Sequence, residues 1–85
     1  MDKTILPTNC IKKEFEALTK CKVSFRDKNK ECVSFKLIRG PLFLKVGWDN
    51  VQKYFEESFA NVKVWRSFDE FGFDVFLVRV YPEAI

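Results

Sequence analysis

Cationic side chains are concentrated in the first half of the chain, where they could bind an anionic polymer. Residues 1–45 carry eleven Lys and Arg against five Asp and Glu, a net charge of +6, while residues 46–85 carry four against seven, a net charge of −3. Lysine and arginine neutralise phosphates along a nucleic-acid backbone, so this asymmetry suggests a cationic face suited to nucleic acid. Ordinary solvated strands and loops would produce the same asymmetry, and charge alone leaves both interpretations open. Seven of the cations fall on neighbouring predicted strands and loops: Lys22, Arg26, Lys28, Lys30, Lys36, Arg39 and Lys45.

Side chains that could carry out catalysis are few. The chain has no histidine, which excludes Ser–His and Cys–His nucleophile pairs. The acidic pairs Glu56–Glu57 and Asp69–Glu70 are neighbours in sequence on a predicted helix surface and a predicted turn. General acid–base catalysis instead needs carboxyl groups that converge in a pocket. The three glycines are isolated, so the chain has no glycine-rich phosphate loop. We therefore expect a protein that is not an enzyme and needs no cofactor.

The cysteines do not form a metal-binding pattern. Cys10, Cys21 and Cys32 are odd in number, no two of them form a C-x-x-C pair, and no histidine is available to complete a zinc site. We expect buried free thiols, with a reactive or regulatory thiol as the alternative.

Length and composition predict one small globular domain. The chain has 85 residues, of which 47% are hydrophobic and 32% are charged, and ten phenylalanines supply much of the core volume. No apolar run approaches the roughly 18 residues of a membrane span, and no signal-peptide stretch follows the first three residues. We expect an intracellular chain that does not associate with membranes.

Hydrophobic periodicity predicts six short strands and two helices. Two alternating segments joined by four polar residues predict a hairpin over 21–38, and a second hairpin is expected over 61–81. An open sheet of this size would expose its edges, so partial closure is favoured. The predicted fold is mainly β with two short helices, arranged as an antiparallel open β-barrel. Strands are expected over 3–6, 21–26, 31–38, 42–46, 61–68 and 73–81, and helices over 10–18 and 50–59.

Many of the aromatic residues have two possible roles. Exposed rings could stack on the bases of single-stranded nucleic acid. However, Phe15, Phe25, Phe35, Phe55 and Phe73 all fall on the inward phase of their predicted elements, so core packing is the favoured interpretation.

The stretch over residues 39–55 contains the sharpest local signals. Gly40 and Pro41 interrupt the preceding strand, and Gly47 permits a tight backbone before the large Trp48 ring. Asp49 is expected to accept hydrogen bonds from the first free amides of the following helix.

The order of these motifs resembles the plant B3 DNA-binding domain, in particular its divergent reproductive-meristem branch. Ile5-Leu6-Pro7 precedes a short helix, the hairpin strands follow, and Gly47-Trp48 leads into the second helix before the final strand and Pro82. The resemblance covers nearly the whole chain. It implies a seven-stranded pseudobarrel with two helices that serves as a nuclear transcription-factor module and binds double-stranded DNA.

The resemblance also implies two arms that enter the major groove. An arginine on such a loop suits guanine, which assigns base contact to Arg39, while Lys36 and Lys45 suit phosphates. The alternative is a protein-interaction or dimerisation module that pairs or self-associates through an open strand edge, because only four residues precede Ile5, where the family has a further strand. The implied DNA contacts are Lys3 and Thr4 in the first arm, Arg39, Gly40, Pro41 and Leu42 in the second, and Lys36 and Lys45 beside it.

Overall fold

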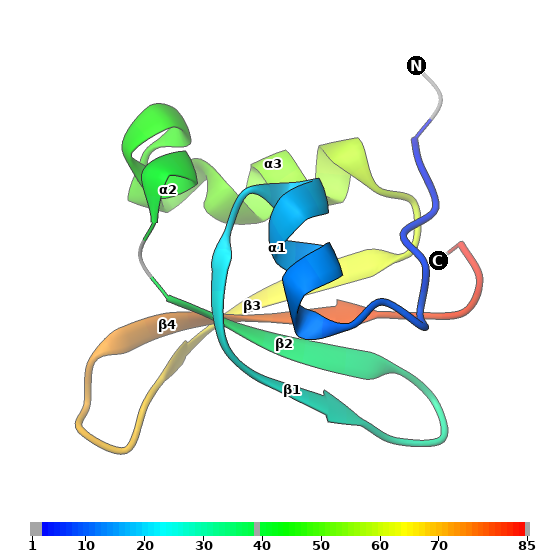
Figure 1. The fold of residues 1–85 in the computed structure, drawn as a ribbon. Coiled ribbons are helices and arrows are strands. Elements are labelled where there is room, and N and C mark those ends of the chain that lie inside the picture. Colours follow the sequence, from blue (N-terminus) through cyan, green and yellow to red (C-terminus); the bar gives the residue numbers. More distant parts are fainter. Residues whose placement is uncertain (1–2, 39, 85) are drawn as a thin grey trace.

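The sheet and the helices that cover it are arranged as two layers (Figure 1). The computed structural model describes residues 3–38 and 40–84. Within these residues, four antiparallel strands form one sheet and the three α-helices lie on one side of it. The elements in chain order are α1 (Lys12–Thr19), β1 (Lys22–Lys28), β2 (Val33–Ile38), α2 (Pro41–Val46), the 3₁₀ helix η1 (Trp48–Asn50), α3 (Val51–Ser58), β3 (Val62–Phe68) and β4 (Asp74–Val80).

The sheet has the strand order β1-β2-β4-β3. Both predicted hairpins are confirmed, and they join through antiparallel pairing of β2 with β4. Within the described residues, β1 and β3 are therefore the two edges, and the sheet is not closed. The mainly β class with short helices is confirmed, whereas the described chain has four strands and three α-helices instead of six and two.

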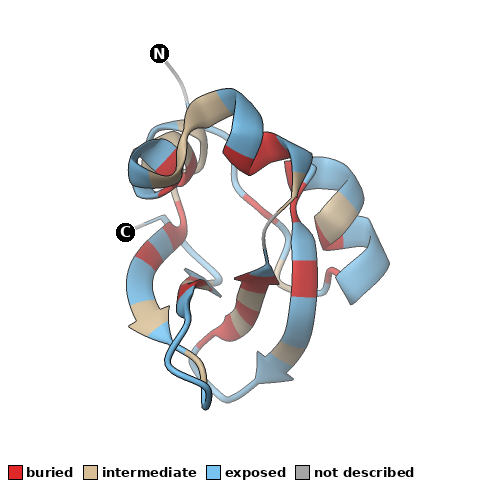
Figure 2. Ribbon diagram, turned by 90° about the vertical axis from the view of Figure 1, so that its left-hand side faces the viewer, coloured by how far each residue is buried: buried red, intermediate tan, exposed pale blue. Residues whose placement is uncertain are grey.

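Three phenylalanines form the centre of the core between sheet and helices. Phe15 of α1, Phe35 of β2 and Phe55 of α3 are each 0% exposed. The rings of Phe15 and Phe35 are stacked, with centroids 3.8 Å apart and an interplanar angle of 12°. Phe15 also lies nearly parallel to Phe55, at 6.5 Å. Figure 2 shows the resulting alternation of buried and exposed residues along the strands. These three residues confirm the inward assignment.

Phe25 and Phe73 were also predicted to point inward, and for both the prediction is wrong. Phe25 is 42% exposed because the pairing of β1 with β2 shifts by one residue between Val23 and Phe25, which is the signature of a β-bulge. One extra residue reverses the faces of all side chains beyond it. Phe73 lies just before β4 in the hairpin turn and is 69% exposed.

The predicted strand over 42–46 is wrong, because Pro41–Val46 is the α-helix α2. Gly40 is extended and precedes a proline in the first turn, where a missing N–H costs no hydrogen bond. Leu42 and Phe43 are 6% and 5% exposed, while Leu44 is 86% exposed. Two adjacent buried residues fit one face of a helix and conflict with the alternation of a strand.

The predicted helix cap at Asp49, in the corner after α2, is wrong. Gly47 has φ +83°, so a backbone that favours glycine links α2 to η1. Asp49 makes no capping hydrogen bond; its Oδ1 lies 3.9 Å from Nη1 of Arg66 on β3. Trp48 packs edge-on against Phe43, with centroids 5.2 Å apart. The corner is therefore held by ring packing instead of an aspartate cap.

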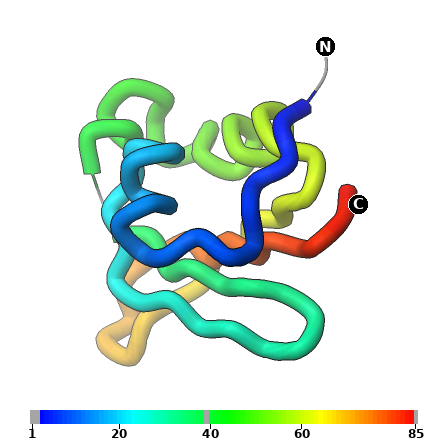
Figure 3. The backbone as a smooth tube through the Cα atoms, turned by 45° about the vertical axis from the view of Figure 1, so that its right-hand side comes forward, coloured from blue at the N-terminus to red at the C-terminus, as the bar shows by residue number. Residues whose placement is uncertain are grey.

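The N-terminal segment is fastened beside the C-terminal end of α3. The predicted strand over 3–6 is a single parallel bridge between Thr4 and Phe59. Beyond this bridge, the side-chain amide of Asn61 makes three hydrogen bonds. Its Oδ1 accepts from the Leu6 N–H at 2.8 Å, and its Nδ2 donates to the carbonyls of Leu6 and Tyr81, both at 2.7 Å. Asn61 is 0% exposed. This side chain joins the N-terminal segment to Tyr81, which directly follows β4, and Figure 3 shows the first and the last described segments on the same side of the molecule.

The three cysteines are free and buried, as predicted. Burial raises the pKa of Cys21 from its ordinary value of 9.0 to about 12. Burial, followed by the charge of Glu14, also raises the pKa of Cys10. Both thiols therefore remain protonated at neutral pH, which makes them poor nucleophiles in the folded chain.

The Cys21 thiol is expected to make the fold less stable in alkali. Above about pH 9 the unfolded chain releases this proton while the folded chain keeps it until about pH 12, so the free energy of unfolding falls as pH rises. Between about pH 8 and about pH 10 the free energy of unfolding should fall by about 1 kcal/mol because of this thiol. Urea unfolding of the native chain and of Cys21→Ala at both pH values measures it. Equal pH dependence in the two proteins would contradict the assignment.

Candidate nucleic-acid interface

The face of the sheet opposite the helices carries a mixed aromatic and cationic surface. Directly paired residues of antiparallel strands share a face. Phe25 pairs with Lys36, Lys36 with Leu77, and Leu77 with Trp65, so one row crosses all four strands. We call this surface the outer face; it comprises Lys22, Phe25, Asp27, Ser34, Lys36, Ile38, Lys63, Trp65, Leu77 and Arg79.

The outer face has a strong positive charge for its size. Each strand contributes one cation: Lys22 from β1, Lys36 from β2, Arg79 from β4 and Lys63 from β3. Asp27 is the single anion among the ten residues of this face. Its net charge of +3 equals that of the whole chain. A surface of this kind attracts polyanions.

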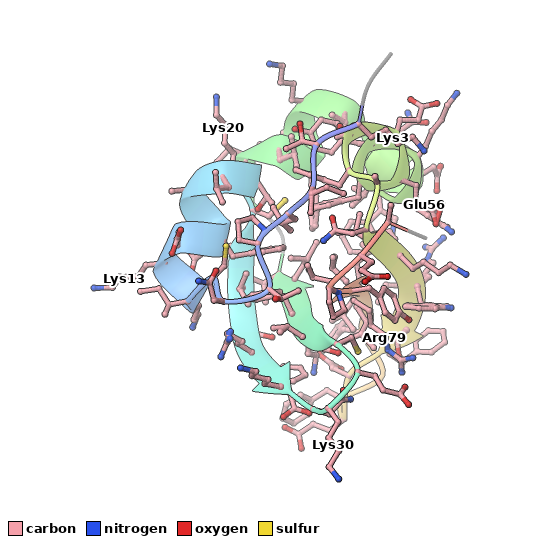
Figure 4. All side chains as sticks on the ribbon, turned by 90° about the vertical axis from the view of Figure 1, so that its right-hand side faces the viewer. Lys3, Lys13, Lys20, Lys30, Glu56 and Arg79 are labelled. Atoms are coloured by element: carbon pink, nitrogen blue, oxygen red, sulfur yellow. The ribbon has the colours of Figure 1, made fainter. Side chains whose placement is uncertain are left out.

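Two of these cations lie over aromatic rings of the same face. The Nζ atom of Lys36 is 5.8 Å from the ring centroid of Phe25. The guanidinium carbon of Arg79 is 4.7 Å from the ring of Trp65. Figure 4 shows Arg79 well away from Lys13 of α1. Both distances are within the range of cation–π attraction, which orients the charged groups along the row.

The residues of the predicted second arm have different environments. Arg39 lies outside the described residues. Pro41 and Lys45 are exposed on α2, whereas the Leu42 side chain belongs to the hydrophobic core. Gly40 packs against β1, since a Cβ on it would lie 3.6 Å from the Lys22 amide nitrogen. Among the described residues of the second arm and the two lysines beside it, Lys36 alone belongs to the outer face.

The predicted first arm lies beside α3 instead. The Thr4 N–H donates to the carbonyl of Ser58 at 3.1 Å, and its carbonyl accepts from Ala60 N–H at 2.9 Å. Lys3 is exposed, and Figure 4 shows it at the same end of the molecule as Glu56. It lines a shallow hollow of about 370 Å³ whose other residues are Asp49, Gln52, Lys53, Glu56 and Glu57. Three carboxylates in this hollow make it less attractive to a polyanion than the outer face.

Sequence reasoning missed Lys63, Arg79 and Trp65 as candidate contacts. The alternation over 61–68 does place Lys63 and Trp65 opposite the buried valines, so their exposure was predictable. The pairing of β2 with β4, which brings them beside Lys36, is a long-range feature with no local signal. Conversely, the bulge turns Arg26 to the inner face, with its guanidinium carbon 5.9 Å from the Phe35 ring.

A larger hollow of about 570 Å³ lies where the β3–β4 hairpin meets the Trp48 corner. Arg66 lies in its wall and forms an ion pair with Asp74, with Nη2 and Oδ2 3.1 Å apart. Phe73 lines the same hollow. Across residues 3–38 and 40–84, no group of three or more acidic or cysteine side chains is placed to hold a metal ion.

Comparisons with protein-family models, with curated proteins and with solved structures found no match to the chain. Among the helices that the structure describes, none combines the length and the apolar character needed to cross a membrane.

Proposed function

We propose that the protein binds double-stranded DNA as a B3-like transcription-factor module that acts in the nucleus and catalyses no reaction. One observation carries this proposal: every strand of the sheet places one cation on the same outer face, which has a net charge of +3. Phosphate contacts by lysine and arginine supply most of the affinity of non-specific DNA binding.

The order of elements also supports a B3-like module. A short N-terminal segment, a helix, a hairpin, the helix α3 after Trp48 and a second hairpin follow one another in the order that the resemblance implies, while α2 stands where the resemblance implies a strand. In this proposal the open sheet, extended by the N-terminal segment beside α3, is the counterpart of the family's pseudobarrel. Lys36 holds phosphate, Arg39 contacts a base, and the exposed Lys45 reaches the backbone beside it.

Duplex binding is expected to depend steeply on salt. If the four cations of the outer face each neutralise one phosphate, the logarithm of the affinity should fall with the logarithm of salt concentration with a slope of about −3.6. Replacing Lys36 and Arg79 with alanine removes two contacts and should lower the slope to about −1.8. At about 0.1 M salt this corresponds to a loss of about 60-fold in affinity, because each contact contributes about eightfold. Fluorescence anisotropy with a labelled duplex over a salt series measures both quantities.

A matched control is available on the opposite side of the molecule. Lys12→Ala with Lys13→Ala removes the same charge from exposed positions of α1. This double variant should keep a slope near −3.6. Equal losses in the two double variants would show that net charge alone attracts the duplex and would remove the outer face from the proposal.

A second candidate function is a protein-interaction module. β3 is an edge of the described sheet, and it carries the exposed rings of Trp65 and Phe68, at 39% and 70%. An extended segment of a partner, or of a second copy, could pair with this edge by strand addition. Duplex binding distinguishes the two functions: a chain that binds no duplex at low salt favours the protein-interaction module.

A further inference from the structure

The aromatic rings of the outer face are exposed in a way that packing does not require. Phe25 and Trp65 lie on opposite edge strands and are 42% and 39% exposed. They belong to one row of paired residues that also contains Lys36 and Leu77. Three strand spacings of about 4.8 Å separate β1 from β3, so the two rings stand about 14 Å apart across the sheet.

Each ring of this row is combined with a cation. Lys36 lies 5.8 Å from the Phe25 centroid, and Arg79 lies 4.7 Å from the Trp65 centroid. A guanidinium held over an indole offers a flat, positively charged plane on which a base can stack, and it can also reach a phosphate. Lys63 is the direct partner of Arg79 on the next strand and adds a second phosphate-binding charge.

We propose that the outer face binds single-stranded nucleic acid, with one base at Phe25 and another at the Trp65–Arg79 pair. Phosphates between and beside them contact Lys36 and Lys63. This inference rests on the proposal that the cationic outer face binds nucleic acid, and it adds single strands to the duplex as a second ligand of that face. Bases in a duplex have their π-faces covered by their neighbours, whereas unpaired bases present these faces to aromatic side chains. The positive charge of the face complements a phosphodiester backbone.

The test compares single-stranded and duplex probes. Anisotropy is measured with fluorescent oligodeoxyuridine, with oligouridine of the same length and with the duplex used above. Phe25→Ala and Trp65→Ala are each expected to weaken binding to the single strands about 5- to 150-fold. Duplex affinity should change less than twofold. Equal affinity for the two single strands indicates contacts to bases and phosphates alone, while a preference for oligouridine indicates that the ribose 2′-hydroxyl is also bound.

The matched control removes rings of the same kind from another exposed site. Phe68→Ala and Phe71→Ala act near the β3–β4 turn, where these rings are 70% and 76% exposed. Neither should alter binding to single strands. Phe25→Leu and Trp65→Leu keep an apolar side chain in the row and should lose single-strand affinity like the alanine variants. This second pair therefore separates loss of stacking from loss of folding.

Two outcomes overturn the inference, and only the first of them leaves the proposed duplex binding intact. If the leucine variants bind single strands like the native chain while Lys36→Ala with Arg79→Ala loses duplex affinity, the stacking role is wrong and duplex binding stands. If the native chain binds neither probe at low salt, nucleic-acid binding itself is wrong and the stacking role falls with it.

Discussion

Replacing Phe35 with alanine is expected to lower the free energy of unfolding by about 3–5 kcal/mol. The Phe35 ring is fully buried, and it stacks on Phe15 at a centroid distance of 3.8 Å. Its loss would leave a cavity between β2 and α1, which neighbouring rings cannot fill without leaving their own positions. Since a domain of this kind is stable by about 5–15 kcal/mol, this one change removes a large part of its stability.

Urea unfolding followed by circular dichroism measures this loss. Phe71→Ala provides the control, because it removes the same ring from a position that is 76% exposed. That variant should stay within about 0.5 kcal/mol of the native chain. If the two variants lost similar amounts, the ring stack would not be the centre of the core.

Asn61→Ala is expected to lower the free energy of unfolding by about 3 kcal/mol or more. The substitution removes the partner of two buried polar groups, the N–H and C=O of Leu6, and of the partly buried C=O of Tyr81. Each unsatisfied buried group costs about 1–3 kcal/mol. In a domain of this size, the corresponding fall in melting temperature is about 15 °C.

Asn29→Ala is the matched control for this prediction. The Asn29 side chain accepts hydrogen bonds from the N–H groups of Glu31 and Cys32 at 2.9 and 2.8 Å, but it lies in an exposed turn. In the variant, water can accept hydrogen bonds from these two N–H groups in place of the Asn29 side chain, so the free energy of unfolding is expected to fall by only about 1 kcal/mol. Amide hydrogen exchange adds a local readout: in Asn61→Ala, the Leu6 amide should exchange much faster than amides of β2. Unchanged protection of Leu6 would show that the N-terminal segment is held by other contacts.

Local sequence patterns predicted the two hairpins well because each depends on alternation and a short polar turn. The helix over residues 12–19 and the helix after Trp48 were also predictable from their apolar spacing. The strand predicted in place of α2 was wrong because the six residues between Gly40 and Gly47, all apolar or cationic, suit a strand as well as a short helix with one buried face. Whether this segment forms a helix or a strand depends on how Leu42 and Phe43 pack in the core, and the other core residues are distant in sequence.

The candidate site was less predictable than the fold. Charge counted along the chain directed attention to residues 1–45, yet Lys63 and Arg79 of the outer face come from the acidic half. What unites them with Lys22 and Lys36 is the pairing of β2 with β4, which joins two hairpins far apart in sequence. The two implied arms depend on loops, and the resemblance, not the periodicity, suggested them.

The bulge in β1 decides which side chains beyond it reach the outer face. Ser24 stands between Val23, which faces the core, and Phe25, which faces solvent. A strand that kept Ser24 but paired without the bulge would alternate strictly, which would turn Phe25 inward and Arg26 outward with no change in the sequence. Deleting Ser24 would instead remove the bulge and leave Phe25 outward and Arg26 inward. A related chain could thus keep every aromatic and basic residue and still present a different surface. Homologues of this protein should therefore be aligned by strand pairing across the bulge, with a gap allowed at Ser24, before any residue of this face is compared.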